Sequence, residues 1–307
     1  MTESSPTLPA GLPLMTEVSQ QTYPPGTLYV VATPIGNVAD ITLRALHVLA
    51  LADVVACEDT RNTAQLLARY GLSKTLLAAH EHNEREVAEK LITRLQAGER
   101  IALVSDAGTP AVSDPGARIV DAVRNAGLRV MPLPGASAGL AALSASGLLN
   151  DRFHFYGFLP AKGKQRATAL TALLGMAATM VFYEAPHRIV ETVDALTTVF
   201  EPTREVVFAR ELTKLFEEIH RCPLSEAAAW VAADAHRLRG EYVILLAGAT
   251  IEREGDEVEA ERVLKILMAE CPLKQAAALA AQLTGQKKNA LYELALRLKE
   301  EGAGDSD

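Results

Sequence analysis

The chain has 307 residues, 49% of them hydrophobic, and it carries a formal net charge of −8 at pH 7. This hydrophobic content excludes a disordered chain, and the length is enough for two domains, because single hydrophobic cores stop growing near ~250–300 residues. The negative charge disfavours a protein that coats nucleic acid non-specifically, since such binding depends on cationic groups that displace counterions. Local basic patches remain compatible with it.

Residues 1–25 are rich in Pro, Ser and Thr and are expected to form a mobile tail. The segment lacks the basic region and the long apolar region of a secretory signal. No apolar stretch approaches the ~20 residues that span a membrane, so we expect no membrane partner. The few scattered cysteines, Cys57, Cys222 and Cys271, argue against a disulfide framework or a zinc site and favour a cytoplasmic protein.

Residues 26–149 alternate between strand-like and helix-like segments, which predicts an α/β domain with a mostly parallel sheet. Asp40 is the expected cap of the first helix. The strands are predicted at 27–33, 54–57, 101–104 and 129–133. The helices are predicted at 41–50, 60–70, 83–97, 118–125 and 138–143.

The pattern changes near residue 150, and residues 150–250 are predicted to form a second, mixed α/β domain. A β-rich segment at 153–160 leads into a loop and then a helix that ends near Leu174. Clear strands are predicted at 179–183, 205–210 and 241–247, and a weaker one at 215–220.

The last part of the chain, residues 256–302, is predicted to be a small helical domain that follows a charged linker at 252–259. Its helices are expected at 258–269, 273–283 and 289–300, with Gly285 as the terminator of the second. Amphipathic helices separated by a short turn are typical of a helix-turn-helix arrangement.

Turn-forming residues are concentrated after the predicted strand at 101–104, over the stretch Ser105–Gly116, and a similar cluster occupies 132–137. An ordinary connection between a strand and a helix needs only two to six residues. Ligands bind at the carboxyl ends of strands in open α/β sheets, so these loops predict a small-molecule site. For Asp106 and Thr109 the alternative is a turn that bonds only to itself.

These loops resemble the tetrapyrrole methylase superfamily, and the chain is most similar to the branch that methylates bacterial small-subunit ribosomal RNA. The resemblance covers residues 26–300. In the first half it is carried by 30–37, 58–61, 105–110, 113–116 and 134–138. In the second half it is carried by 157–160, 182–188, 210–214 and 240–242, and in the tail by 272–275 and 287–292.

The resemblance implies a bilobal α/β fold with S-adenosylmethionine bound in a cleft between the two α/β domains, plus the small helical domain. It also implies methylation of the ribose 2′-hydroxyl of a cytidine in the decoding region of 16S rRNA within the small ribosomal subunit, by a homodimer that uses no metal. An ordinary Rossmann methyltransferase is disfavoured, because no Gly-x-Gly-x-x-Gly follows the first strand.

Matching the superfamily motifs residue by residue implies the cofactor contacts. The first loop departs from the glycine-rich version common in the precorrin branch, since 33–37 keeps only Gly36. From the first domain the implied contacts are Pro34, Asp106, Gly108, Thr109, Gly135, Ser137 and Ala138. From the second domain they are Phe182, Tyr183, Leu212 and Gly240.

A ribose hydroxyl is a poor nucleophile, and a base typically accelerates its reaction by ~10²–10⁴-fold. Glu58, Asp59 and Arg61 are the favoured candidates, because they could orient a ribose or clamp a phosphate. The alternative is that Asp59 caps a helix and pairs with Arg61. His187 is either a base or a structural histidine. Further candidates after predicted strands are Glu184, Arg188, Glu211 and Lys214.

RNA binding requires cations. One predicted phosphate clamp is a glycine-containing loop with Lys162, Lys164 and Arg166, whose alternative is a solvated surface loop. In the tail, Lys274, Lys287 and Lys288 are expected to contact the RNA backbone, with Tyr292 stacking on a base. The tail is equally expected to pack on the enzyme or on a dimer partner.

Two other functions remain open. One is a precorrin-type carbon methylase, which needs a wide cleft for a macrocycle. The other is a non-catalytic RNA-binding module for ribosome assembly.

Overall fold

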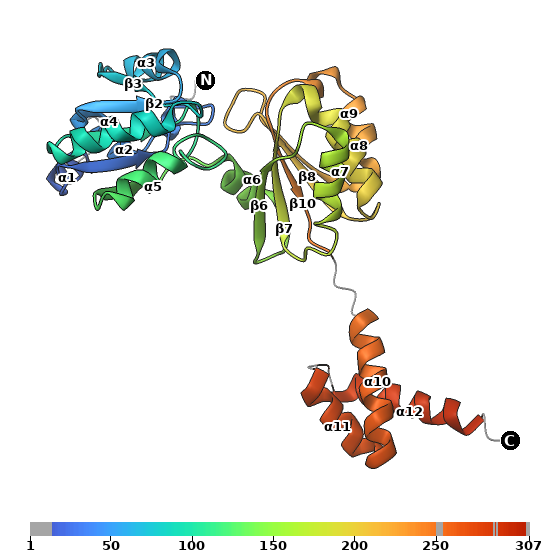
Figure 1. Ribbon diagram of the computed structural model, residues 1–307. Helices are drawn as coiled ribbons and strands as arrows, with labels where there is room; N and C mark the ends of the chain where they lie inside the picture. The colour runs from blue at the N-terminus through green and yellow to red at the C-terminus, as the bar shows by residue number, and fades with distance from the viewer. Residues whose placement is uncertain (1–13, 250–253, 285, 287, 305–307) are drawn as a thin grey trace, which may run out of the picture. The chain divides into compact units, whose positions relative to one another are not determined.

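The computed structural model describes residues 14–249, 254–284, 286 and 288–304. The chain divides into two compact units, one up to Gly248 and one from Ala249 (Figure 1). Across these described ranges, the helices are all too short or too polar to cross a membrane.

The first sheet of the larger unit has five parallel strands in the order β3-β2-β4-β1-β5. Because all five run in the same direction, the loops that follow them meet at one edge of the sheet. The strands are β1 Thr27–Val31, β2 Val54–Cys57, β3 Leu76–Ala78, β4 Arg100–Val104 and β5 Arg129–Leu133.

Helices cover both faces of this sheet, which explains why β2 and most of β4 are continuous apolar runs with every residue buried. One face carries α2 Leu43–Leu51 and α3 Thr60–Arg69, and the other carries α4 Glu84–Gln96 and α5 Ala117–Asn125.

The segment expected to be a tail is ordered in its described part. Leu14–Gln20 forms helix α1, which packs beside α2, and Val18 and Tyr23 are buried. The mobile-tail prediction is therefore wrong from residue 14 onward, because these two apolar side chains pack into the first domain.

The second sheet has the order β6-β7-β10-β8-β9, with β6 parallel to β7 and all other pairs antiparallel. Its strands are β6 Phe153–Phe158, β7 Thr179–Glu184, β8 Glu205–Arg210, β9 Glu218–Pro223 and β10 Tyr242–Leu246. One face is covered by α7 Gly163–Thr171, α8 Ile189–Val199 and α9 Leu224–Ala232.

The opposite face of the second sheet is covered by α6, Ala138–Ser146 (Figure 1). Ala142 of this helix is fully buried against Val181 and Val207. The sequence places α6 in the first domain, yet the helix packs on the second sheet. Its small apolar side chains permit this close approach.

Several elements differ from the sequence prediction. The cap of α2 is Thr42, whose Oγ1 accepts from Ala45 N at 3.1 Å, whereas Asp40 ends a 3₁₀ turn, η1 Val38–Asp40. The weak strand begins at Glu218, not Leu215, because the chain before it turns through the bonds of Lys214 N to Glu211 O and of Glu217 N to Lys214 O. Besides α1, the strand β3 and the helices α8 and α9 lie outside the prediction.

The smaller unit consists of α10 Glu254–Glu270, α11 Leu273–Thr284 and α12 Lys288–Gly304. The linker expected at 252–259 is helical from Glu254 onward. The predicted terminator Gly285 lies outside the described residues. The core of the unit is built of small and branched apolar side chains that are fully buried: Ala260, Leu264, Ala277, Ala280, Leu291 and Ala295.

Candidate functional site

Two loops of the first sheet are joined by main-chain hydrogen bonds. Loop 1 (residues 32–37) follows β1, and loop 3 (residues 105–116) follows β4. Thr33 N donates to Gly108 O at 2.8 Å and Gly108 N donates to Thr33 O at 3.0 Å. Gly108 has φ +80°, and a Cβ added there would lie 3.4 Å from Ile35 Cγ2. Glycine is therefore required by the backbone conformation at this position.

Loop 3 continues in an uncommon conformation. Ala111 and Ser113 have φ values of 68° and 61°, and Gly116 has φ 125°. Non-glycine residues in this region cost about 1–3 kcal/mol each and cluster at functional sites. The loop is held by Glu84 of α4, whose buried carboxylate accepts from Gly116 N at 2.6 Å. A strained loop that the fold holds in this way is a candidate binding site.

The second-sheet side of the site is formed by the loop after β8. Gly36 of loop 1 abuts it so closely that an added Cβ would lie 3.0 Å from Leu212 O. Lys214 Nζ donates to Glu211 Oε1 and to Glu241 Oε2, each at 2.8 Å. Burial alone lowers the pKa of Lys214, but its bonds to these two carboxylates outweigh burial, and the pKa is raised. Lys214 is therefore charged, and its ammonium group is bound to both carboxylates.

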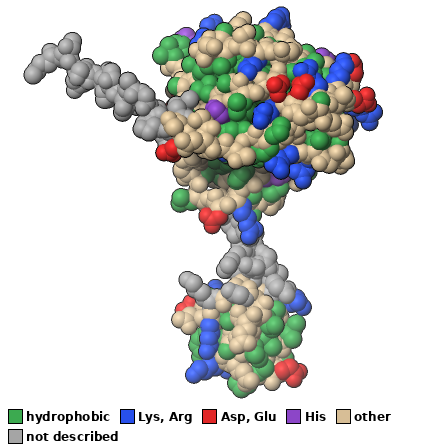
Figure 2. All heavy atoms as spheres, turned by 90° about the vertical axis from the view of Figure 1, so that its left-hand side faces the viewer, with side chains coloured by type: hydrophobic (Ala, Val, Ile, Leu, Met, Phe, Trp, Pro, Cys, Tyr) green, Lys and Arg blue, Asp and Glu red, His purple; other side chains and the backbone are tan. Residues whose placement is uncertain are grey.

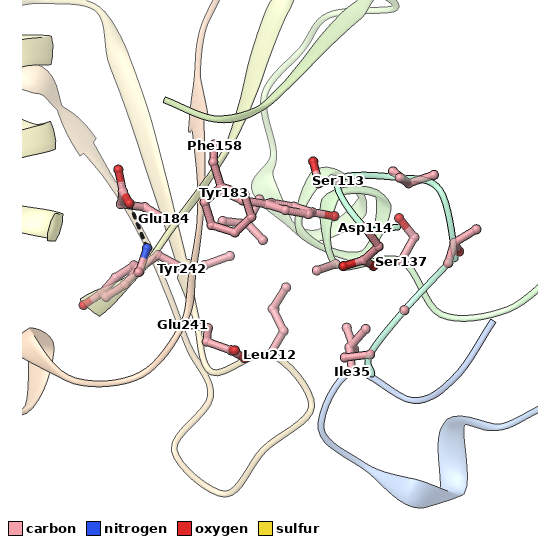
Figure 3. A pocket seen from close by; sticks show the side chains of 18 of the residues that line it. Ile35, Ser113, Asp114, Ser137, Phe158, Tyr183, Glu184, Leu212, Glu241 and Tyr242 are labelled. Atoms are coloured by element: carbon pink, nitrogen blue, oxygen red, sulfur yellow. Dashed lines mark hydrogen bonds between the residues drawn. The ribbon is translucent and has the colours of Figure 1, made fainter. Parts of the chain in front are cut away.

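A cleft of about 260 Å³ lies between these loops. Figure 3 shows Ser113, Asp114 and Ser137 on one side and Tyr183, Glu184 and Tyr242 on the other. Its lining is mainly apolar, with a few polar groups, as is usual for small-molecule sites. From the first half of the chain it is lined by Ile35, Ala107, Gly108, Thr109, Val112, Ser113, Asp114, Ser137 and Ala138. From the second half it is lined by Phe158, Tyr183, Glu184, Ala185, Pro186, Ala209, Leu212, Lys214, Glu241, Tyr242 and Val243.

Asp114 is an ionisable lining residue that the sequence prediction missed, as it missed Glu241 and Tyr242. Burial, followed by the negative charges of Glu58 and Asp106, raises the pKa of Asp114 to about 6. A signal was present in the sequence, because Asp114 lies in the same turn-rich loop as Asp106, and Glu58 follows another strand of the sheet. Strand order could not be read from the sequence, so this crowding of carboxylates could not be foreseen.

Tyr183 lies across the cleft from Asp114, and its hydroxyl points toward Asp114 in Figure 3. Its oxygen accepts from Gly139 N, at the start of α6, at 3.1 Å. Burial raises the pKa of Tyr183, so the phenol stays neutral near pH 7. It connects the second sheet to the helix that follows loop 4 (residues 134–137, after β5).

Six of the residues implied to bind the cofactor line the cleft: Gly108, Thr109, Ser137, Ala138, Tyr183 and Leu212. Phe182 does not, because alternation along β7 directs it to the opposite face, where it is fully buried in the core under α7–α9. Pro34 is also absent from the lining, although its neighbour Ile35 belongs to it.

The other three implied cofactor residues also lie outside the lining and hold loops together. Asp106 accepts from Asp59 N at 3.2 Å and from Asn62 Nδ2 at 2.8 Å. A Cβ on Gly135 would lie 2.7 Å from Ala32 Cβ, and one on Gly240 would collide with the side chain of Glu211.

The catalytic candidates all lie outside the cleft lining: Glu58, Asp59, Arg61 and His187. Asp59 caps α3 by accepting from Arg61 N at 2.8 Å and pairs with the Arg61 guanidinium at 2.7 Å. Hydrogen bonds from Arg61 lower the pKa of Asp59 to about 2. The capping alternative therefore describes the observed geometry. The pKa of Glu58 is raised by burial and then by the negative charge of Asp106. His187 is exposed in the 3₁₀ turn η2 Pro186–Arg188.

Of the further candidates, Glu184 and Lys214 line the cleft, whereas Arg188 and Glu211 do not. The carboxylate of Glu184 is fully buried and accepts from Ala185 N at 2.8 Å and from Thr192 Oγ1 at 2.6 Å, with Arg188 Nε at 3.3 Å. All of its partners are structural. Within the described ranges, no group of three or more His, Cys, Asp or Glu side chains is placed to hold a metal ion.

The cations predicted to bind RNA fall into two classes. Lys162 and Lys164 are exposed, whereas Arg166 is buried and pairs with Glu191 at 2.9 Å. The prediction that Arg166 contacts phosphate is wrong, because α7 begins at Gly163 and turns this side chain toward α8. Lys274 and Lys288 are exposed in the smaller unit, and Lys287 lies outside the described residues.

Comparison with known proteins gives a consistent result over nearly the whole chain. The family of Tetrapyrrole (Corrin/Porphyrin) Methylases matches residues 27–228, and the RsmI C-terminal HTH domain matches residues 254–299. The Pseudomonas aeruginosa protein named Ribosomal RNA small subunit methyltransferase I is 52% identical over 89% of this chain and 97% of its own length. The protein of the same name from Escherichia coli O157:H7 is 51% identical over 88% of this chain and 95% of its own length.

Among solved structures, uroporphyrin-III C-methyl transferase from Thermus thermophilus, complexed with S-adenyl homocysteine, has a TM-score of 0.51. It is 20% identical and covers 72% of this chain and 97% of its own. This likeness concerns the fold of the larger unit.

Proposed function

The chain belongs to the tetrapyrrole methylase family, and from this membership we propose that it is an S-adenosylmethionine-dependent methyltransferase of small-subunit ribosomal RNA. The observation that carries the proposal is the likeness of more than 50% identity, over nearly the full length of both chains, to proteins named for that activity. The proposed acceptor is the ribose 2′-hydroxyl of a cytidine in 16S rRNA within the small subunit. Such a substrate would place the protein in the cytoplasm.

The cleft fits the proposed cofactor in shape. Gly108 allows close approach of a ligand to the main chain, since it carries no side chain and its φ of +80° disfavours one. Thr109 Oγ1 donates to Ala136 O at 3.0 Å, so loop 3 and loop 4 present one continuous wall. We therefore assign cofactor contact to the six matched residues that line the cleft.

The cleft also fits the cofactor in charge. S-adenosylmethionine supplies, when bound, a methyl group activated by a positively charged sulfur. The lining contains three carboxyl groups, on Asp114, Glu184 and Glu241, and one ammonium, on Lys214. Lys214 is balanced by Glu211 and Glu241, and Glu184 is balanced by Arg188, so Asp114 is the lining carboxyl that has no ion-pair partner among the described residues, and its charge favours a cation.

The main task of the chain's own residues in such a displacement is positioning. Holding two reactants in line is worth roughly 7–11 kcal/mol of the barrier. The main-chain bonds between loops 1 and 3, and the contact of Gly36 with the loop after β8, give the cleft a fixed shape suited to this task.

The RNA would be bound by exposed groups beside the cleft. Phe158 lines the cleft with 51% of its surface exposed, which suits stacking on a base, and Lys162 follows it in the chain. On the face shown in Figure 2, cationic and anionic side chains are interspersed and form no continuous basic field. We therefore propose a few phosphate contacts, at Lys162 and Lys164, with Lys274 and Lys288 of the smaller unit.

The activity is tested by incubating the protein with labelled S-adenosylmethionine and small ribosomal subunits from a strain that lacks this methylation. We expect label in 16S rRNA at a position resistant to alkaline cleavage, since a methylated 2′-oxygen cannot attack the neighbouring phosphate. In a parallel incubation with a porphyrinoid in place of the subunits, label in the porphyrinoid would instead support a carbon methylase, and no label in either incubation would contradict the proposal. The homodimer expected from the family is tested separately by sedimentation of the purified protein.

The phosphate contacts have their own test. Replacing Lys162 and Lys164 by Gln should weaken RNA binding and flatten the dependence of log affinity on log salt, by up to ~0.9 for each phosphate that is no longer neutralised. The control is Lys90→Gln, which removes an exposed lysine of α4 that pairs with Glu86. An equal slope in both variants would show that the two lysines are merely exposed.

A further inference from the structure

The four helices that cover the first sheet share one feature, because each has an arginine as its second residue. The amino terminus of a helix carries a partial positive charge, so a cation at this position is unfavourable for the helix. In α2, α3 and α5 the first turn contains no acidic residue that would balance it. The four residues, called the rim arginines below, are Arg44 of α2, Arg61 of α3, Arg85 of α4 and Arg118 of α5.

The rim arginines gather at one edge of the first sheet. Each of the four helices starts beyond the carboxyl end of one strand and runs back to the amino end of the next, because the strands are parallel. Their amino termini therefore lie at the carboxyl edge, where loops 1 and 3 line the cleft. Since α2 and α3 cover one face of the sheet and α4 and α5 the other, the rim arginines flank this edge on both sides.

Contacts with loop 3 fix the starts of two of these helices beside the cleft. Asn62, next to Arg61, donates from Nδ2 to Asp106 at 2.8 Å. On the other face, Glu84 accepts from Gly116 N, two residues before Arg118, at 2.6 Å. Arg61 and Arg118 are thus attached to helix ends that the cleft loop itself holds in place.

The fold makes little use of this positive charge. Arg44 and Arg85 enter none of the ion pairs formed by the described residues, and Arg44 Nε is buried without a hydrogen-bond partner there. Arg118 lies 3.8 Å from Glu84, and 70% of its side chain is exposed. Arg61 pairs with Asp59, yet 85% of its side chain is exposed. Structural partners therefore do not account for four cations at positions that disfavour them.

We propose that the rim arginines bind phosphate groups of the RNA backbone on both sides of the cleft edge. This proposal rests on the proposed function and adds a second surface to the lysines assigned above. Lys164, one of those lysines, is likewise the second residue of its helix, α7.

A phosphate also removes the electrostatic conflict at the four helix ends. The guanidinium group presents its N–H donors in a fork that matches two phosphate oxygens. The free main-chain N–H groups and the dipole of the first helical turn attract the same anion. An arginine that is unfavourable in the free protein therefore becomes favourable once the RNA is bound.

The first test compares the two ends of the same two helices. The rim variant is Arg61→Gln/Arg118→Gln, and the control variant is Arg69→Gln/Arg124→Gln, which removes exposed arginines from the last turns of α3 and α5. Both lose two positive charges. Binding to unmethylated small ribosomal subunits is measured at several salt concentrations. The rim variant should flatten the slope of log affinity against log salt by up to ~0.9 for each arginine, and the control should keep the wild-type slope.

Two further measurements separate RNA binding from folding and chemistry. The rim variant should raise the KM for small subunits and leave kcat and the calorimetric affinity for S-adenosylmethionine unchanged, since the arginines lie away from the reacting atoms. Arg118→Gln alone should not lower the melting temperature, whereas Arg124→Gln should lower it slightly, because a cation is favourable only in the last turn.

Equal salt slopes of the rim and control variants would overturn the proposal and leave the proposed function intact. A lower melting temperature of Arg118→Gln, together with a wild-type slope of the rim variant, would assign a structural role and also overturn it. A wild-type protein that does not methylate small subunits would instead contradict the proposed function, and the comparison of salt slopes does not depend on that result.

Discussion

The two sides of the cleft are held by different forces. On the first-sheet side, main-chain groups bond to each other, as between Thr33 and Gly108. On the second-sheet side, charged side chains bond to each other, as Lys214 does with Glu211 and Glu241. Loops after parallel strands converge and present main-chain donors to a ligand, whereas the antiparallel sheet ends in loops whose half-buried charges require partners. We conclude that the two sides of the cleft reach a fixed shape by different means, although both contribute lining residues.

The largest effect is expected at the buried charge of the second side. Glu184→Ala leaves Arg188 and Thr192 without their carboxylate partner, and breaking a buried pair costs about 3–5 kcal/mol. The free energy of unfolding, measured by urea denaturation, should fall by that amount. The control Glu86→Ala removes an exposed ion pair of α4 and should change it by less than ~1 kcal/mol. Equal losses of unfolding free energy in the two variants would contradict the larger cost expected for breaking the buried ion pair.

A smaller effect, confined to binding, is expected on the first side. Gly108→Ala and Gly127→Ala both place a side chain at a positive φ, 80° and 72°, and each should cost about 1–2 kcal/mol of stability. Only Gly108 lines the cleft, so only that variant should also weaken cofactor binding, by about tenfold or more. Calorimetric titration with S-adenosylmethionine measures this. Similar affinity in both variants would place the cofactor elsewhere.

The smallest effect is expected at the exposed charge pair on the first side. The pKa of Asp59 is lowered to about 2 by Arg61, so its ionised form adds stability above the unfolded pKa of about 3.9. That stability is lost as the pH falls toward 2. Asp59→Asn keeps a capping side chain but has no titrating group. The melting temperatures of the two proteins should differ near neutral pH and converge in acid, whereas a constant difference would contradict the assigned ion pair.

Loop 3 shows how much of the site was accessible from sequence. Its position after a buried strand and its turn-forming residues are local features, and they led correctly to the edge where the cleft lies. Thr109 and Ser137 were placed at the cleft by motif resemblance. Phe182 and Tyr183 are adjacent in sequence, but alternation along β7 puts one in the core and the other in the cleft. A motif match assigns the same role to both neighbours, so it does not separate the residue in the core from the residue in the cleft.

Arg166 shows a different limit. A lysine- and arginine-rich segment around a glycine predicts an exposed loop, but the helix begins at Gly163 and its period buries Arg166 against α8. Helix α8, Ile189–Val199, was not foreseen because its many β-branched residues weaken the helical signal, and its burial against the second sheet outweighs that weakness. Without α8 the environment of Arg166 could not be known.

The alternation of strands with helices, the parallel first sheet and the loops at its edge were all encoded locally, because apolar runs and turn formers act over a few residues. Only the assembled fold put α6 on the second sheet and brought Glu58, which follows β2, close enough to act on Asp114 in loop 3. These relations join residues that are far apart in the chain, through strand order and packing; Glu58 and Asp114, for example, are 56 positions apart. Electrostatic coupling and burial depend on distance in space, and the order of residues in the chain specifies that distance only after folding.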